Sequence, residues 1–145
     1  MRQLGAIWDL TDETAGQLKR GDLIEEIFNQ WKDKYKNYQN LNEVIPNYKT
    51  LDFDGILNNA NEVVSLKTYH PKLATEKSLS TITGKIDGYA KSLSNATLEA
   101  AHAGKTRVLD FTIKKGEWTS FMDDILDKVG DLEVKYSVEI RITEF

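Results

Sequence analysis

Apolar and polar positions along the chain change their period several times, and each change marks a predicted element. Residues 11–35 repeat their apolar positions at helical spacing, which predicts a first helix. Residues 49–57 and 62–69 instead alternate between apolar and polar, which is typical of strands. Because turn-forming residues separate these two segments, the pattern predicts a β-hairpin.

The rest of the chain returns to helical spacing and then alternates twice more between helix and strand. The further predicted elements are a helix over 75–103, a strand over 105–113, a helix over 117–130 and a strand over 132–145. Breaks in the long helix are expected near Gly84 and Gly88. This order predicts one α/β domain over 1–145, with a mixed central sheet flanked by helices.

The predicted hairpin gathers polar side chains on one of its faces. If residues 58–61 form a four-residue loop, Asp54 opposes Ser65 and Asp52 opposes Lys67. Directly opposed side chains in an antiparallel pair have their Cβ atoms about 4.5–5.5 Å apart. The other face would carry the apolar positions Leu51, Phe53, Val64 and Leu66.

This polar patch supports two interpretations. Two carboxylates can hold a hard divalent cation, and a neighbouring lysine can orient a water molecule or neutralise a phosphoryl group. Alternatively, Asp52 and Lys67 form an ordinary surface ion pair that stabilises the sheet by well under about 1 kcal/mol. A further acid can come from the first helix, where Glu25 and Glu26 lie on either side of the apolar stripe.

Charge is distributed unevenly along a chain whose net charge is −4. Residues 67–115 hold nine basic against four acidic residues, whereas the segments on both sides are acidic. The basic segment is consistent with a polyanionic partner or with a solvated helix face. His70 stands at the predicted end of a strand, where it can contact a substrate or a zinc ion, or simply occupy an exposed turn.

Composition excludes some classes of protein. The chain has no cysteine, which rules out disulfides and thiolate metal sites. No apolar run approaches the length of a membrane span, and the first residues lack the order of a signal peptide. We therefore expect a soluble protein without a membrane partner.

Three short motifs together resemble a known family. "RGDLIE" ends at Glu25 on the first helix, "LDFD" ends at Asp54, and "VVSLK" holds Ser65 and Lys67. In this order they resemble the PD-(D/E)xK nuclease superfamily, and more closely the C-terminal toxin domains of contact-dependent growth inhibition (CdiA-type) and related polymorphic bacterial toxins. The resemblance implies a restriction-endonuclease-like fold. It also implies a catalytic set of Glu25, Asp54 or Asp52, Ser65 and Lys67, in which Glu25 and Asp54 bind the metal ion.

The same resemblance implies a function. Members of this group hydrolyse phosphodiester bonds of DNA or tRNA with Mg²⁺ or Zn²⁺, and a cognate immunity protein blocks them. The domain would then be delivered as part of a larger effector and act in the cytoplasm of a target cell. The basic segment would contact the nucleic acid, through candidates that include His70, Lys72, Lys77 and Lys85.

Two non-catalytic alternatives remain open at this point. An acidic α/β protein can itself be an immunity or adaptor protein that blocks a basic partner. A chain with Ser65 in the place of an acid can also be an inactive member of the nuclease fold that only binds nucleic acid. Both alternatives predict that neither DNA nor tRNA is cleaved.

Overall fold

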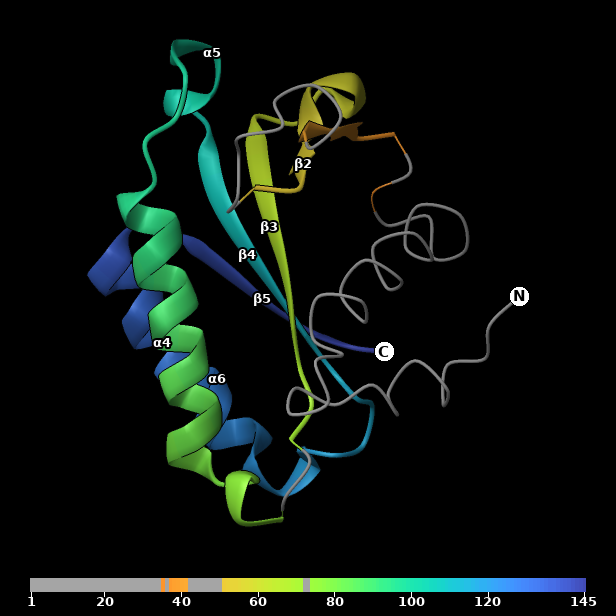
Figure 1. Cartoon of the computed structure of the whole chain (residues 1–145), viewed down its shortest axis with the longest axis vertical. Helices are drawn as coiled ribbons and strands as arrows, with labels where there is room; N and C mark the ends of the chain where they lie inside the picture. The colour runs from red at the N-terminus through yellow and green to blue at the C-terminus, as the bar shows by residue number, and fades with distance from the viewer. Residues whose placement is uncertain (1–34, 36, 42–50, 72–73) are drawn as a thin grey trace.

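The computed structural model of the chain describes residues 35, 37–41, 51–71 and 74–145 (Figure 1). The described strands are β1 (Gln39–Asn40), β2 (Phe53–Asp54), β3 (Glu62–Tyr69), β4 (Thr106–Ile113) and β5 (Glu139–Glu144). The described α-helices are α4 (Leu79–Asn95), α5 (Ala100–Ala103) and α6 (Met122–Tyr136). Short 3₁₀ helices are η2 (Gly55–Asn58), η3 (Ala74–Glu76) and η4 (Thr119–Phe121). The predicted first helix, with Glu25, lies outside the described residues.

The strands form one mixed sheet in the order β1-β2-β3-β4-β5, which confirms the predicted α/β class. The pairs β1–β2 and β2–β3 are antiparallel, whereas β3–β4 and β4–β5 are parallel. Parallel neighbours need a crossover connection, and α4 and α6 provide the two crossovers. Both helices lie side by side on the same face of the sheet, which we call the helix face (Figure 1). None of the described helices combines the length and apolar character that a membrane span requires.

Apolar side chains pack on both faces of β3. Val63 and Tyr69 belong to the core between the sheet and the two helices. Val64 and Leu66 belong to a second cluster on the opposite face, together with Phe53 of β2. Because side chains alternate along a strand, Ser65 and Lys67 lie on the helix face.

The long helix predicted over 75–103 breaks at a different place from the one expected. It divides after Asn95, into α4 and α5, whereas Gly84 and Gly88 both lie inside α4. Both glycines are exposed. A Cβ added at either position would meet no neighbouring atom within 4 Å, so packing does not require a glycine there. Ser78 caps the start of α4 by accepting a hydrogen bond from the Thr81 N–H at 3.3 Å.

The last predicted strand begins later than the alternation suggested. Helix α6 continues to Tyr136, and β5 starts only at Glu139. Leu132 is buried in the same core as Ile125 and Val129, so the helical apolar stripe extends into the segment expected to be a strand. Ser137, at φ 54°, then ends the helix in the left-handed conformation.

The predicted hairpin register is wrong by two residues. Asp54 pairs with Val63 rather than with Ser65, and Phe53 pairs with Val64. The reason is η2, which begins directly after Asp54 and removes residues 55–57 from the predicted strand. The turn requires a glycine at its start, because a Cβ on Gly55 would lie 2.7 Å from a backbone oxygen.

A second irregularity lies just before β2. The Asp52 N–H donates to the Val64 carbonyl at 2.8 Å, although Val64 already pairs with Phe53. Two residues opposite one partner is the pattern of a β-bulge, which interrupts the alternation. As a result Leu51 packs in the helix-face core and Phe53 in the opposite cluster, so the prediction that they share a face was wrong. The predicted opposition of Asp52 and Lys67 is wrong for the same reason.

Candidate functional site

Asp54 is a buried carboxylate at the end of β2, with a side chain only 2% exposed. Its Oδ1 accepts a hydrogen bond from the Ile56 N–H at 3.1 Å, which caps η2. The same oxygen lies 2.5 Å from Lys105 Nζ, and Oδ2 lies 3.1 Å from His102 Nε2. Asp54 therefore has a backbone donor, an ammonium group and an imidazole around one carboxylate. We call Asp54, His102 and Lys105 the Asp54 cluster.

His102 and Lys105 reach Asp54 from the segment that leads into β4. His102 lies in α5, and Lys105 immediately precedes β4, whose start lies beside the start of β3 (Figure 1). The Thr106 N–H donates to the Asn61 carbonyl at 3.1 Å and fixes this approach. Since β3 lies between β2 and β4, the backbones at Asp54 and Lys105 are about 10 Å apart, from strand spacings of about 4.8 Å. A long side chain is needed to bridge that gap.

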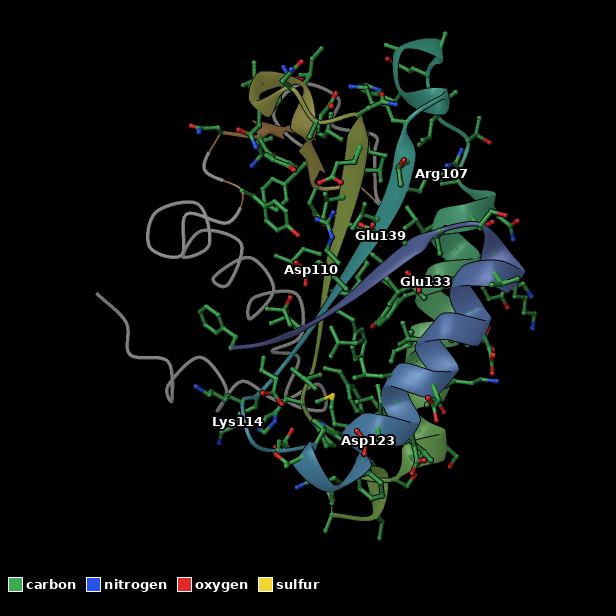
Figure 2. The ribbon with its side chains drawn as sticks, turned by 180° about the vertical axis from the view of Figure 1, so that it is seen from behind. Arg107, Asp110, Lys114, Asp123, Glu133 and Glu139 are labelled. Carbon is green, nitrogen blue, oxygen red and sulfur yellow. The ribbon has the colours of Figure 1, made fainter. Side chains whose placement is uncertain are left out.

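Arg107 holds the end of α4 beside this cluster. Its Nη1 lies 2.7, 3.0 and 2.8 Å from the carbonyl oxygens of Leu93, Ser94 and Ala96, at the C-terminus of α4, where carbonyls lack the donors of a following turn. Figure 2 shows Arg107 on β4, where that strand passes the end of the helix. The segment between α4 and α5 is therefore anchored to the sheet close to the residues that bind Asp54.

Ser65 contributes a buried hydroxyl group to the same face of the sheet. It is 1% exposed, and no hydrogen-bond partner for its Oγ lies among the residues that the structure describes. Val63, the pairing partner of Asp54, is two residues away on the same face, so Ser65 is the diagonal neighbour of Asp54. A buried hydroxyl without a partner costs about 1–3 kcal/mol, which calls for an explanation.

Lys67 lies further along β3 and points to α4. Its Nζ is 5.7 Å from the centre of the Tyr89 ring, a cation–π arrangement. Within the described part of the chain it forms no salt bridge. Four residues separate it from Val63, which is about 13 Å along a strand. The structure thus places Lys67 on the predicted face but does not bring its ammonium group to Asp54.

The predicted substrate contacts lie at the other end of the sheet. His70 Nδ1 is 3.0 Å from Glu117 Oε1, and both side chains are largely buried. Lys85 Nζ lies 5.8 Å from the Tyr69 ring centre, and Lys77 is exposed. His70 is seven residues from Val63, about 23 Å along the strand, so the structure does not join these residues to the Asp54 cluster. Lys72 and Glu25 lie outside the described residues.

The oxygen donors near Asp54 suit a divalent cation, although the described residues supply only part of a site. The Asp54 carboxylate and the unpaired Ser65 hydroxyl are hard donors of the kind that Mg²⁺ prefers. The described part of the chain holds no group of three metal-binding side chains. A complete site would need further ligands, for which Glu25 remains the predicted source.

A second buried carboxylate, Asp110, lies on the face opposite to the helices (Figure 2). It is 0% exposed and accepts hydrogen bonds from Tyr35 Oη at 2.5 Å, Thr143 Oγ1 at 2.7 Å and Thr112 Oγ1 at 3.2 Å. These three donors are neutral hydroxyl groups. Burial, and then the carboxylate of Asp110, raise the pKa of Tyr35 well above its ordinary value. We call these four residues the Asp110 cluster.

Arg141 extends the polar network on this face. Its Nη2 lies 2.8 Å from Glu62 Oε2 and 2.7 Å from Glu139 Oε2, and Tyr38 Oη donates to Glu62 Oε1 at 2.6 Å. Burial alone would raise the pKa of Glu62, but the hydrogen bonds from Arg141 and Tyr38 outweigh it and lower that pKa. Glu62 is therefore held in its ionised form.

Sequence reasoning identified Asp54 and Ser65 but missed the two residues that bind Asp54. His102 and Lys105 lie about 50 residues further along the chain, and no motif links them to the hairpin. The available signal was topological, because Lys105 begins the strand predicted over 105–113, which follows the hairpin through a long helical crossover of the kind that joins parallel strands. Residues just before parallel strands meet at one edge of a sheet, where the hairpin turn also lies.

Comparison with known proteins supports the fold. No protein-family model and no curated protein matches the sequence. The structure resembles a chain of the CdiA-CT/CdiI toxin and immunity complex from Yersinia pseudotuberculosis, with a TM-score of 0.52 and 14% sequence identity. The match covers 69% of this chain and 85% of that chain. At this identity the likeness establishes a shared α/β fold.

Proposed function

We propose that this chain is a metal-dependent nuclease domain of a bacterial antagonistic toxin, which cleaves DNA or tRNA and is blocked by a cognate immunity protein. The fold is shared with a chain from a toxin and immunity complex, which supports a role in such a pair. The motif resemblance through Glu25, Asp54, Ser65 and Lys67 favours the toxin over the immunity protein. The enzymatic activity itself rests on the arrangement around Asp54.

The observation that carries the proposal is the buried Ser65 hydroxyl. It has no partner among the described residues, yet it lies on the same face as the buried Asp54 carboxylate. Structural serines at such depth normally form hydrogen bonds, and each exception needs a reason. A ligand that enters the site, such as a water molecule beside a bound cation, would provide the missing partner.

Each residue then has a distinct task. Asp54 binds the cation together with Glu25, and Ser65 Oγ orients a water molecule through a hydrogen bond. When bound, a divalent cation supplies Lewis-acid polarisation of the phosphate and a more acidic water. Lys67 neutralises charge on the phosphoryl group, which requires its Nζ to leave the Tyr89 ring. Exposed lysines of α4 such as Lys85 add electrostatic attraction for nucleic acid.

Digestion assays test this proposal. Supercoiled plasmid DNA and total tRNA are each incubated with the protein and Mg²⁺ or Zn²⁺, with and without EDTA. We expect cleavage of one substrate that EDTA abolishes and that Lys67→Met reduces at least about a hundredfold. Lys128→Met, at an exposed position on α6, is the matched control and should retain full activity. Absence of cleavage under every metal condition would refute the nuclease.

A non-catalytic binding protein is the second candidate, and one observation favours it. The Asp54 carboxylate is already bonded to Lys105 and His102, as expected for a structural ion pair in a protein that only binds a partner. In that case the chain is an immunity protein, an adaptor or an inactive member of the nuclease fold. The digestion assay separates this reading from the first, because a binding protein leaves both substrates intact.

A further inference from the structure

Lys105 forms an ion pair with Asp54, the carboxylate that the proposed function assigns to a metal ion. Its Nζ lies 2.5 Å from Asp54 Oδ1, and the two side chains are only 13% and 2% exposed. Oδ1 also accepts the Ile56 N–H, and Oδ2 is engaged by His102. Among the described residues the carboxylate therefore has three partners, of which Lys105 carries a full positive charge.

The contacts of Lys105 differ from those of Arg107, the nearby basic residue on β4. Arg107, two residues on, donates to helix carbonyls and forms no salt bridge within the described part of the chain. Lys105 instead reaches across the start of β3, about 10 Å of sheet, to place its charge on Asp54. Meanwhile the neighbouring Ser65 hydroxyl stays without a partner in the described part of the chain. The positive charge of Lys105 therefore lies against the Asp54 carboxylate, the group that a metal ion would need as a ligand.

We propose that Lys105 is a built-in counter-ion of Asp54, which holds the carboxylate when no divalent cation is present and which the cation must displace. The inference rests on the proposed function, because it takes Asp54 as a metal ligand. Two cations cannot both lie against Oδ1, since their mutual repulsion at such a distance in a poorly hydrated site is large. Lys105 therefore lowers the affinity of the site for a divalent cation. After displacement its flexible stem keeps the ammonium group near the site, where it can contact a phosphate.

The test measures metal affinity rather than cleavage. Isothermal titration calorimetry with Mn²⁺ alone compares the wild-type chain with Lys105→Gln, Lys105→Arg and Lys114→Gln. Lys114 is exposed just beyond the far end of β4 (Figure 2), about 30 Å along the strand from Lys105 and beyond the Debye length of about 10 Å at 0.1 M salt. Lys114→Gln therefore controls for the change in net charge, and Lys105→Arg keeps the local charge.

We expect Lys105→Gln to bind Mn²⁺ at least about tenfold more tightly than wild type, because the competing cation is gone. Lys105→Arg and Lys114→Gln should stay within about twofold of wild type. A purely structural ion pair gives the opposite sign, since a loosened site binds the metal more weakly. Affinity of Lys105→Gln equal to or weaker than that of wild type overturns the counter-ion role.

Two further outcomes keep the test decisive. If Lys105→Gln is unfolded without metal, Mn²⁺ should refold it, because binding to the folded state alone stabilises that state. Circular dichroism during the Mn²⁺ titration measures this refolding. A Lys105→Gln chain that stays unfolded at Mn²⁺ concentrations that saturate wild type overturns the inference. If the folded wild type and folded Lys105→Gln both show no Mn²⁺ binding, the proposed metal-dependent function fails and the counter-ion role fails with it. If wild type binds but Lys105→Gln gains nothing, only the counter-ion role fails.

Discussion

Two carboxylates are buried in the same sheet, one on each face, and the contacts identified for each differ in kind. Asp110 is bonded to the hydroxyl groups of Tyr35, Thr112 and Thr143, which are neutral. Asp54 is bonded to a lysine and a histidine and lies beside Ser65, whose hydroxyl has no partner among the described residues. Hydroxyl groups satisfy a carboxylate without adding a charge, whereas an ammonium group on a flexible stem can be exchanged for another cation. Under the proposed function, the Asp54 cluster takes part in the reaction and the Asp110 cluster serves stability.

The two carboxylates should respond differently to the same substitution. Asp110→Asn should lower the free energy of unfolding by about 3 kcal/mol, because an amide replaces an acceptor for several buried donors. Asp54→Asn should cost only about 1 kcal/mol, since the amide oxygen still caps η2 and Lys105 can extend to solvent. Urea unfolding measures both. Equal losses at the two positions would remove the distinction between the clusters.

The turn that positions Asp54 should be sensitive to a single methyl group. Gly55→Ala places a Cβ 2.7 Å from the Ala60 backbone oxygen, so we expect a loss of about 2–3 kcal/mol. Gly84→Ala is the matched control in α4. A Cβ added there meets no neighbouring atom within 4 Å, and a helix favours alanine over glycine by about 1 kcal/mol. Thermal unfolding compares the two variants. A stable Gly55→Ala protein would contradict the close turn after Asp54.

The Asp110 cluster should show a graded response to the loss of its hydroxyl groups. Tyr35→Phe should cost about 1–2 kcal/mol, and Tyr38→Phe less, because Tyr38 is more exposed. The raised pKa of Tyr35 adds a pH signature. Above pH 10 the unfolded chain releases this proton and the folded chain keeps it, so wild type loses stability as the pH rises. Urea unfolding between pH 9 and 11 measures this loss of stability. Tyr35→Phe should lose less than wild type over that range, by about the contribution of one titrating group.

Glu62 should give the smallest effect, and one with the opposite dependence on pH. Its folded-state pKa lies below the ordinary value of 4.5, so the unfolded chain binds more protons below pH 4.5. The contribution of Glu62 to stability is therefore present above that pH and is lost as the pH falls further. Glu62→Gln should cost about 1 kcal/mol at pH 7 and less at pH 3, as unfolding at the two pH values would reveal. A loss that is constant with pH would contradict the ion pair with Arg141.

Much of the fold was predictable from periodicity, and the errors have local causes. Alternation correctly located β3 and β4, whose apolar side chains pack against the rest of the chain on each face. It failed at Asp52, where a bulge shifts the faces, and after Asp54, where η2 replaces the strand. Alternation cannot detect either device, because both depend on backbone hydrogen bonds rather than on the order of apolar residues.

The candidate site was predictable only where its residues are close in sequence. Asp54 and Ser65 were placed on one face of the sheet, although the register that joined them was wrong by two residues. His102 and Lys105 approach from the crossover between β3 and β4, so a pattern within the hairpin could not contain them. The role of Glu25 stays a prediction, because that residue lies outside the described part of the chain.

The most direct test of the contrast between the two clusters is cleavage by Asp54→Asn and Asp110→Asn under identical conditions. Plasmid DNA and total tRNA are incubated with each folded variant and with wild type, in Mg²⁺ or Zn²⁺, and rates are scaled to the folded fraction. We predict that wild type cleaves one substrate, that Asp54→Asn loses at least about a hundredfold in rate, and that Asp110→Asn retains most of it. Wild-type cleavage that survives Asp54→Asn, or that Asp110→Asn abolishes equally, would contradict the account.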